Sequence, residues 1–175
     1  RWPRLALECI ESLRQALDRD AIVVNDMNTL SYAAVELLES GSPRRFLFPR
    51  GYGTLGYAVP AAIGACLASP KSQVVAVCGD GGFLFTSEEL ATAVRLRLNL
   101  PIIVWNNESF GAIRATRTAA YGRSVDDDLV NPDFSAYAKA FGAAGVRVAS
   151  AAELGSAVAS ALTRHGPTVI DVAAG

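Results

Sequence analysis

Two patterns of apolar residues alternate along the 175 residues of this chain. One consists of short runs in which nearly every position is apolar, as is typical of strands buried on both faces. The other repeats apolar residues every three or four positions, as is typical of helices with one buried face. The continuous runs predict six strands, at residues 21–24, 45–48, 73–78, 101–106, 145–148 and 168–172.

The helical pattern fills the stretches around these strands and predicts helices at residues 3–18, 30–40, 57–68, 87–98, 131–142 and 151–166. We expect Ser87 to cap the fourth helix, and Gly41 and Gly142 to end the second and the fifth. Apolar strands separated by helices indicate an α/β fold, a parallel sheet covered by helices on both sides. Residues 121–129 are the longest irregular stretch, and we expect their three consecutive aspartates to form a solvated turn.

Length and composition bound the function classes. One domain with 51% hydrophobic residues can bury a sizeable core. Sixteen basic and seventeen acidic residues leave a formal net charge of −1, and the scattered arginines argue against a nucleic-acid surface. No apolar stretch approaches the roughly 20 residues that span a bilayer. We expect Cys9, Cys66 and Cys78, which lie far apart, to be small buried hydrophobic residues in a reducing cytoplasm.

Candidate chemistry follows three of the predicted strands directly, in residues 25–29 (NDMNT), 79–82 (GDGG) and 106–109 (NNES). In an open parallel sheet, ligands bind beyond the carboxyl ends of the strands. Asn107 comes 27 residues after Asp80, enough for a helix and a right-handed return to the neighbouring strand. A carboxylate oxygen and an amide oxygen would then converge and suit a magnesium ion that also takes phosphate oxygens. The plain alternative is a turn whose aspartate only caps a helix.

Glycines surround these polar residues. Gly79, Gly81 and Gly82 allow backbone N–H groups to approach an anion closely. A second cluster, GYGTLG at 51–56, fits the G-x-G-x-x-G pattern of dinucleotide-binding folds, so an NAD- or FAD-binding oxidoreductase is an alternative. Pro49 and Arg50 argue against it, because they interrupt the approach to the first glycine, where a dinucleotide-binding strand runs directly into its turn.

Residues 79–114, GDGGFLFTSEELATAVRLRLNLPIIVWNNESFGAIR, resemble the thiamine-diphosphate signature, in which GDG is followed by NN two to three dozen residues later. GYGTLGYAVPAAIGA (51–65), NPDFSAYAKAFGA (131–143) and GPTVIDV (166–172) are also similar to the C-terminal diphosphate-binding domain of acetolactate-synthase-like enzymes. The resemblance implies the three-layer α/β/α thiamine-diphosphate-binding fold with a six-stranded parallel sheet.

The same resemblance implies a ligand set. The side chains of Asp80 and Asn107 and the backbone carbonyl of Ser109 would bind Mg²⁺, together with two diphosphate oxygens and one water. Gly81 and Gly82 would donate backbone N–H groups to the diphosphate, and the hydroxyl of Thr29 would contact it unless Thr29 only begins a capped helix. The cofactor-binding residues implied are Thr29, Gly53, Leu55, Gly79, Asp80, Gly81, Gly82, Asn107, Ser109, Phe110 and Gly111.

The glycine cluster at 51–56 acquires a catalytic role through the resemblance. Leu55 would be the apolar wedge that bends thiamine diphosphate into a V shape, and the Gly53 carbonyl would accept the cofactor's 4'-amino group. The bend brings that nitrogen beside the thiazolium C2 and so promotes its deprotonation. The activity implied is decarboxylation of a 2-oxo acid, after which the enamine is released as an aldehyde or joined to a second carbonyl.

Residues after NN bear on specificity in the family. Pyruvate-decarboxylase-type enzymes carry an acidic residue where this chain has Ile113, whereas acetolactate synthases and benzoylformate decarboxylases carry an aliphatic one. Phe110 and Ile113 are expected either to contact substrate or to pack in the core. Arg114 and Arg117 are expected either to attract a carboxylate or to be solvated helix positions. His165, the only histidine, lies near the C-terminus of the last predicted helix, where it suits the helix dipole, and we expect no catalytic role for it.

A partner is also implied. Ylid formation in the family needs a glutamate from a separate pyrimidine-binding domain, which nothing in residues 1–175 matches. We therefore expect the chain alone to be inactive, and to be either part of a longer polypeptide or the β-type subunit of a two-chain decarboxylase. A non-catalytic regulatory member of the fold is a further alternative. A homodimer or homotetramer is expected, with neither nucleic acid nor membrane as a partner.

Overall fold

The computed structural model describes residues 1–175, and its six strands form one sheet in the order β2-β1-β3-β4-β6-β5. Every neighbouring pair in this sheet is parallel. The strands are β1 (Ile22–Asn25), β2 (Phe46–Leu47), β3 (Val74–Gly79), β4 (Pro101–Asn106), β5 (Ala144–Val148) and β6 (Thr168–Ala173). The predicted α/β fold with six parallel strands is confirmed.

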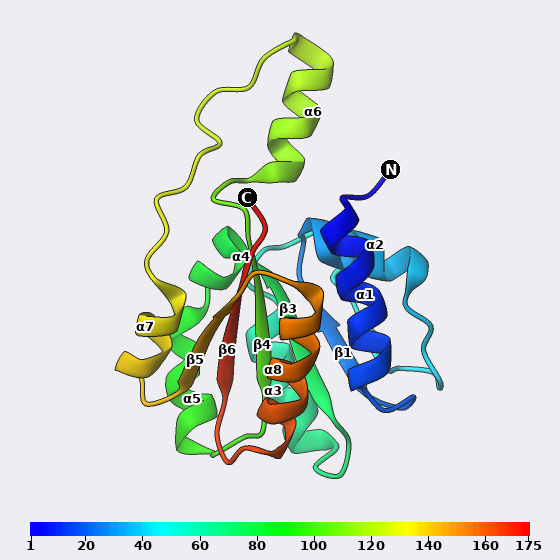
Figure 1. The fold of residues 1–175 in the computed structure, drawn as a ribbon, viewed down its shortest axis with the longest axis vertical. Coiled ribbons are helices and arrows are strands. Elements are labelled where there is room, and N and C mark those ends of the chain that lie inside the picture. The colour runs from blue at the N-terminus through cyan, green and yellow to red at the C-terminus, as the bar shows by residue number, and fades with distance from the viewer.

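Helices cover both faces of this sheet and complete three layers (Figure 1). One face carries α1 (Arg4–Ala16), α2 (Thr29–Leu37) and α8 (Ala151–Thr163). The other carries α3 (Ala58–Ala68), α4 (Asp80–Leu84), α5 (Leu90–Arg95) and α7 (Phe134–Ala140). The remaining elements are a single 3₁₀ turn, η1 (Ser87–Glu89), and α6 (Gly111–Tyr121).

Strand β3 shows why the buried runs are apolar at every position. Val74, Ala76 and Cys78 pack into the core on the α3 side, whereas Val75 and Val77 pack into the core on the α1 side. Side chains alternate between the two faces of a strand, so a strand covered on both faces needs apolar residues throughout. Each large apolar side chain that is fully buried stabilises the fold by about 1.5–3 kcal/mol relative to an exposed one.

The cysteines behave largely as expected. Cys9 and Cys78 are buried in the two cores and Cys66 is half-buried, and none forms a disulfide. Burial raises the pKa of the Cys9 and Cys66 thiols to about 11. They are neutral thiols near pH 7, which suits small hydrophobic residues.

Two predicted helix boundaries are wrong. The helix predicted at 87–98 is broken into η1 and α5, and Ser87 caps neither, because its hydroxyl lies 2.8 Å from the Tyr137 hydroxyl on α7. The second helix ends at Leu37, since Leu38 is already extended, and so it does not reach Gly41. In both places a contact or a backbone turn overrides the local propensity.

Helix α6 and the segment after it extend beyond the carboxyl edge of the sheet, at the top of Figure 1. None of the residues of α6 is buried, and no helix was predicted over its range. The expectation of a solvated acidic turn is wrong for Asp127, which is 3% exposed and bonded to Arg117 at 2.7 Å. Asp126 and Asp128 on either side are exposed.

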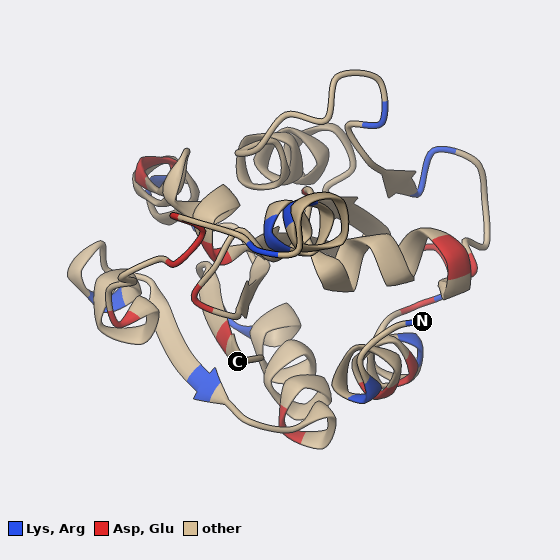
Figure 2. Ribbon diagram, turned by 90° about the horizontal axis from the view of Figure 1, so that it is seen from above, with Lys and Arg blue, Asp and Glu red and all other residues tan.

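Basic and acidic residues are interspersed over the helices and loops (Figure 2). This distribution fits the net charge of −1. No helix combines the length and apolarity required to cross a membrane.

Candidate functional site

A cavity of about 400 Å³ lies at the carboxyl ends of β1, β3 and β4. It sits where the strand order reverses, because the chain goes from β1 outward to β2 and then returns to β3 on the other side. Such switch points are where open α/β sheets bind ligands. All eleven cofactor-binding residues predicted from the sequence line this cavity, namely Thr29, Gly53, Leu55, Gly79, Asp80, Gly81, Gly82, Asn107, Ser109, Phe110 and Gly111.

The carboxylate and the amide at its base come from neighbouring strands, as the 27-residue spacing predicts. Strands β3 and β4 pair with Gly79 opposite Trp105, so Asp80 and Asn107 follow adjacent strand ends. Asp80 is 3% exposed, and each of its carboxylate oxygens accepts one hydrogen bond. The Gly81 N–H donates to Oδ1 at 2.9 Å and the Asn131 amide donates to Oδ2 at 2.9 Å.

The turn after β4 presents oxygens to the same cavity. The Asn107 amide Nδ2 donates to Ser109 Oγ at 3.2 Å, which leaves its carbonyl Oδ1 for a ligand. Glu108 between them has φ +52°, a left-handed conformation that is uncommon outside glycine and that clusters at functional sites. The Ser109 carbonyl accepts a hydrogen bond from the Gly111 N–H at 2.9 Å, and its second lone pair is available for a ligand.

Close packing explains two of the glycines. A Cβ on Gly81 would lie 2.5 Å from Cε1 of Phe110, and a Cβ on Gly111 would lie 2.6 Å from the amide nitrogen of Asn107. A side chain at either position would displace Phe110 or Asn107, which both line the cavity, so glycine keeps these two side chains in place. In this structure the Gly81 N–H donates to Asp80, whereas it was expected to donate to an anion.

The loop between β2 and α3 carries the second glycine cluster. Gly53 and Gly56 have φ +73° and +79°, which glycine adopts without strain. Gly51 follows the end of β2 by four residues, and α3 begins only at Ala58. The strand–turn–helix that a dinucleotide-binding glycine motif requires is therefore not formed here. The loop instead brings Leu55 to the cavity.

Asp26 is a functional candidate that the sequence analysis missed. It is fully buried, and its carboxylate accepts hydrogen bonds from the Met27 N–H and the Gly56 N–H, each at 2.8 Å. Burial raises the pKa of Asp26, and the backbone N–H groups of Met27, Gly56, Ala58 and Tyr57 partly offset that effect. Helix α3 has no side-chain cap of its own, so Asp26 anchors both its start and the loop of Leu55. The signal in the sequence was an acidic residue directly after an apolar strand.

Thr29 begins α2 without capping it. Asn28 is the cap, and its side chain accepts a hydrogen bond from the Ser31 N–H at 3.0 Å. Thr29 therefore lies at the start of a capped helix, as the alternative states, and it also lines the cavity. Tyr32, one turn later, also lines the cavity, and burial together with the charge of Asp26 raises its pKa.

The residues of α6 and its N-cap, Phe110, divide into two groups. Phe110 and Ile113 line the cavity, and Ile113 is 45% exposed, so Ile113 does not pack in the core. Arg114 and Arg117 do not line the cavity, and they pair with Asp128 and Asp127, respectively. These two arginines hold the following loop against the helix. His165 is exposed after the end of α8 and lies outside the cavity.

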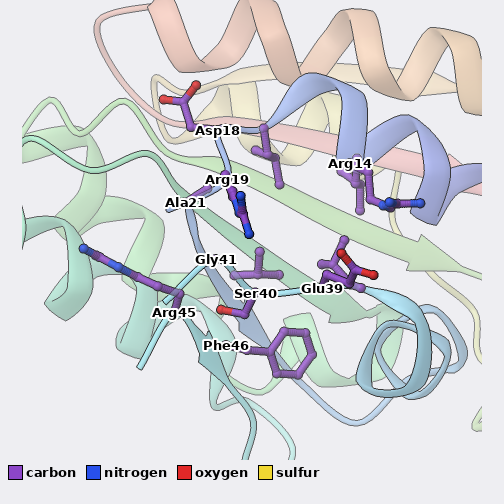
Figure 3. Close-up of a pocket in the computed structure, with 13 residues that line it drawn as sticks. Arg14, Asp18, Arg19, Ala21, Glu39, Ser40, Gly41, Arg45 and Phe46 are labelled. Atoms are coloured by element: carbon purple, nitrogen blue, oxygen red, sulfur yellow. The ribbon is translucent and has the colours of Figure 1, made fainter. Parts of the chain in front are cut away.

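A second cavity, of about 330 Å³, lies at the opposite edge of the sheet, beside the N-terminal ends of β1 and β2 (Figure 3). Its floor is apolar and includes Leu13, Val23 and Phe46, whereas charged side chains such as Arg19 and Glu39 form its rim. None of the residues predicted to bind a cofactor lies in it.

Comparisons with known proteins identify the family to which this chain is similar. The family described as "Thiamine pyrophosphate enzyme, C-terminal TPP binding domain" matches residues 26–172. The chain is 38% identical over 166 residues to the acetolactate synthase of Bacillus subtilis, covering 95% of this chain and 29% of that protein. It is 38% identical over 165 residues to the probable 2-ketoarginine decarboxylase AruI of Pseudomonas aeruginosa, covering 93% of this chain and 29% of that protein.

A solved structure is similar over the same extent. The thiamine diphosphate-dependent 4-hydroxybenzoylformate decarboxylase of Rhodococcus jostii RHA1 superposes with a TM-score of 0.87 at 32% identity, covering 95% of this chain and 32% of that one. The chain thus spans about 29% of the length of the relatives it matches. The chain belongs to the thiamine pyrophosphate enzyme family and constitutes its C-terminal thiamine pyrophosphate-binding domain.

Proposed function

We propose that this chain binds Mg²⁺ and the diphosphate of thiamine diphosphate in an enzyme that decarboxylates a 2-oxo acid. The product would be an aldehyde or the adduct with a second carbonyl compound. The observation that carries the proposal is the convergence of Asp80, Asn107 and Ser109 on one glycine-lined cavity at the switch point of the sheet. The named relatives, an acetolactate synthase and two decarboxylases, support the same reaction class.

The donor set fits magnesium. Asp80 offers carboxylate oxygens, Asn107 an amide oxygen and Ser109 a backbone carbonyl, all of them hard oxygen ligands. Three protein ligands leave positions for phosphate oxygens and water, as Mg²⁺ sites that bind phosphates usually have. The Asn131 Oδ1 atom beside Asp80 is buried without a hydrogen-bond partner, and a metal-bound water would satisfy it.

The other residues of the cavity would orient the organic part of the cofactor. Leu55 presents a half-buried apolar side chain from a loop anchored by Asp26, which suits a rigid wedge. The Gly53 carbonyl is proposed to accept the cofactor's amino group. When bound, thiamine diphosphate supplies a carbon nucleophile and an electron sink for decarboxylation. Phe110 and Ile113 are proposed to exclude water from the reacting end and to contact the substrate.

Activity is proposed for the whole protein. A pyrimidine-binding domain or subunit would supply the glutamate that the reaction needs, within a homodimer or homotetramer. The isolated chain is then expected to be catalytically inactive. Measurable decarboxylation of a 2-oxo acid by residues 1–175 alone would contradict this part of the proposal.

Binding is tested by fluorescence titration of the intact protein. Trp105 is 3% exposed and lines the cavity, so its emission reports on occupancy, and Trp2→Phe removes the other tryptophan of residues 1–175. The same titration of Trp105→Phe gives the background from the rest of the protein. We expect thiamine diphosphate to change the emission only when Mg²⁺ is present, and NAD to leave it unchanged. Binding that is indifferent to Mg²⁺, or a response to NAD, would overturn the proposal.

A further inference from the structure

The side chain of Asn131 joins the ends of β3 and β4 just beneath the candidate metal site. Its amide nitrogen lies 2.9 Å from Asp80 Oδ2 and 2.9 Å from Asn106 Oδ1. Asn106 is 4% exposed and is the first asparagine of the NN pair, next to the candidate ligand Asn107. Neither Asn106 nor Asn131 lines the cavity, so neither directly contacts thiamine diphosphate or the metal ion in the proposed function.

A buried carboxylate on β6 sets the direction of these hydrogen bonds. Asp171 is fully buried, and its two oxygens accept from Asn106 Nδ2 at 2.9 Å and from Arg147 Nη1 at 3.3 Å. An ionised carboxylate only accepts, so Asn106 must turn its NH₂ group toward Asp171 and its oxygen toward Asn131. Asn131 must then present its own NH₂ group, which also reaches Asp80. The orientation of both amides follows from the position of one charge.

Packing fixes the segment that carries Asn131. Asp133 caps α7, accepting a hydrogen bond from the Ala136 N–H at 2.9 Å. The next residue, Phe134, is fully buried, and its ring packs edge-on against Phe83 with centroids 5.5 Å apart. Phe83 follows Asp80 within the same short helix, α4. Two neighbouring aromatic side chains thus lock the Asn131 segment to the segment of Asp80.

We propose that Asn131 is a positioning residue that orients the Asp80 carboxylate for the metal. Asn106 and Asp171, which lies on β6, in turn hold Asn131 in the required orientation. The inference rests on the proposed function. The Gly81 N–H holds Oδ1 of Asp80 and Asn131 holds Oδ2, so hydrogen bonds restrain the carboxylate at both oxygens. Mg²⁺ demands near-ideal octahedral geometry and is therefore sensitive to the orientation of a ligand. Groups that orient metal ligands in this way are typically worth 10–100-fold in metal affinity.

The test measures Mn²⁺ as the probe metal, by electron paramagnetic resonance of the free ion, in the intact protein with saturating thiamine diphosphate. Asn131→Ala is expected to raise the Mn²⁺ Kd at least about tenfold. The matched control is Asn99→Ala, which removes an exposed asparagine that donates to the Leu162 carbonyl away from the cavity. This control is expected to leave the Kd within about twofold. If Asn131→Ala does not fold, Asn131→Leu keeps the branched shape of the side chain and removes the same two hydrogen bonds.

A double-mutant cycle separates orientation from mere structural support. Asp171→Asn is expected to raise the Mn²⁺ Kd about two- to fivefold in the wild-type background and to add nothing to Asn131→Ala, because the chain of hydrogen bonds is already broken. Additive effects, or a folded Asn131→Ala with wild-type Mn²⁺ affinity, would overturn the inference and leave the proposed function intact. A wild-type protein that binds neither Mn²⁺ nor the cofactor would overturn both.

Discussion

The two cavities at opposite edges of the sheet have similar volumes, about 400 and about 330 Å³, but different linings. The first is lined largely by glycines, short polar residues and apolar side chains, with Asp80 as its one carboxylate. The second is rimmed by five long or charged side chains, which are Arg14, Asp18, Arg19, Glu39 and Arg45 (Figure 3).

The polar atoms of the two linings also differ in how firmly they are held. Both oxygens of Asp80 accept hydrogen bonds from neighbours, and the residue is 3% exposed. Arg19 and Glu39 are exposed and form no ion pair. Ordering such long side chains around a ligand costs conformational entropy. The polar groups of the first cavity are already ordered in the folded chain, so ligand binding there avoids this cost. The fixed orientation of buried polar atoms is therefore a better indicator of function than cavity volume.

The largest expected effect tests the carboxylate of the first cavity. Asp80→Ala should weaken Mg²⁺-dependent binding of thiamine diphosphate about 100-fold or more, ~2.7 kcal/mol, because a charged ligand of the metal is lost. Isothermal titration of the intact protein at fixed Mg²⁺ measures this. Asp18→Ala, which removes an exposed carboxylate from the second cavity, is the control and should have no effect. Equal losses in the two variants would remove the distinction between the cavities.

The anchor of the Leu55 loop is expected to matter next for stability. Asp26→Asn keeps the shape of the side chain but turns an NH₂ group toward backbone donors, so that the Met27 or Gly56 N–H loses its acceptor. The free energy of unfolding should fall by about 1–3 kcal/mol. Urea denaturation measures it, and Glu39→Gln at the second cavity should change it by less than about 0.5 kcal/mol.

The same pair of variants tests the pH dependence. Burial raises the pKa of Asp26 in the folded state, so the protonated carboxyl favours folding. Its contribution to stability is greatest below the pKa of an unfolded aspartate and declines as pH rises through the folded value. Asp26→Asn lacks this decline, so the stability advantage of the wild type should shrink from about pH 4 toward pH 7. An advantage that grows with pH would show that the hydrogen bonds outweigh burial.

A smaller effect is expected for the apolar wedge. Leu55→Ala should leave the metal affinity unchanged and slow exchange of the cofactor's C2 proton about tenfold, ~1.4 kcal/mol of activation free energy. The reason is that the shortened side chain no longer enforces the bent cofactor. Proton exchange into D₂O, followed by NMR on the intact protein, measures the rate. Leu38→Ala at the second cavity is the matched truncation, and an identical slowing there would refute the role of Leu55.

The smallest effect is expected at the rim of the second cavity. Arg19→Ala removes an exposed, unpaired guanidinium. Stability should change by less than about 0.5 kcal/mol, and cofactor affinity should stay within about twofold. Thermal unfolding and the fluorescence titration measure these two quantities. A large loss of cofactor affinity would mean that the two edges of the sheet are energetically coupled.

Much of the fold was predictable because its core strands carry the signal locally. Strands β3 and β4 are apolar at nearly every position, and the predicted bounds match those observed to within one residue. The bounds of helix α6 were not predicted, because its apolar positions are mostly alanine and none of its residues is buried. Ser87 was predicted to be a cap because its sequence context suits one, but its bond to Tyr137, fifty residues later, determined its role.

The residues of the candidate site also fall into two groups, those that local motifs predict and those that only distant contacts reveal. The residues that line the cavity lie in short motifs directly after strands, where backbone geometry and residue type are enough to mark them. Asp26 and Asn131 were missed as functional candidates because their partners lie far along the chain, at Gly56 and at Asp80. Nothing in the neighbouring residues identifies such partners.

The sequence by itself determined the class of fold, the two motif segments and the types of atom that they present, because strand burial and turn chemistry depend on residues close together in the chain. Only the tertiary structure decided the strand order, the burial of Asp127 and the hydrogen bonds that orient Asp80. Each of these depends on contacts between distant segments, whose geometry is set when the layers pack against the sheet.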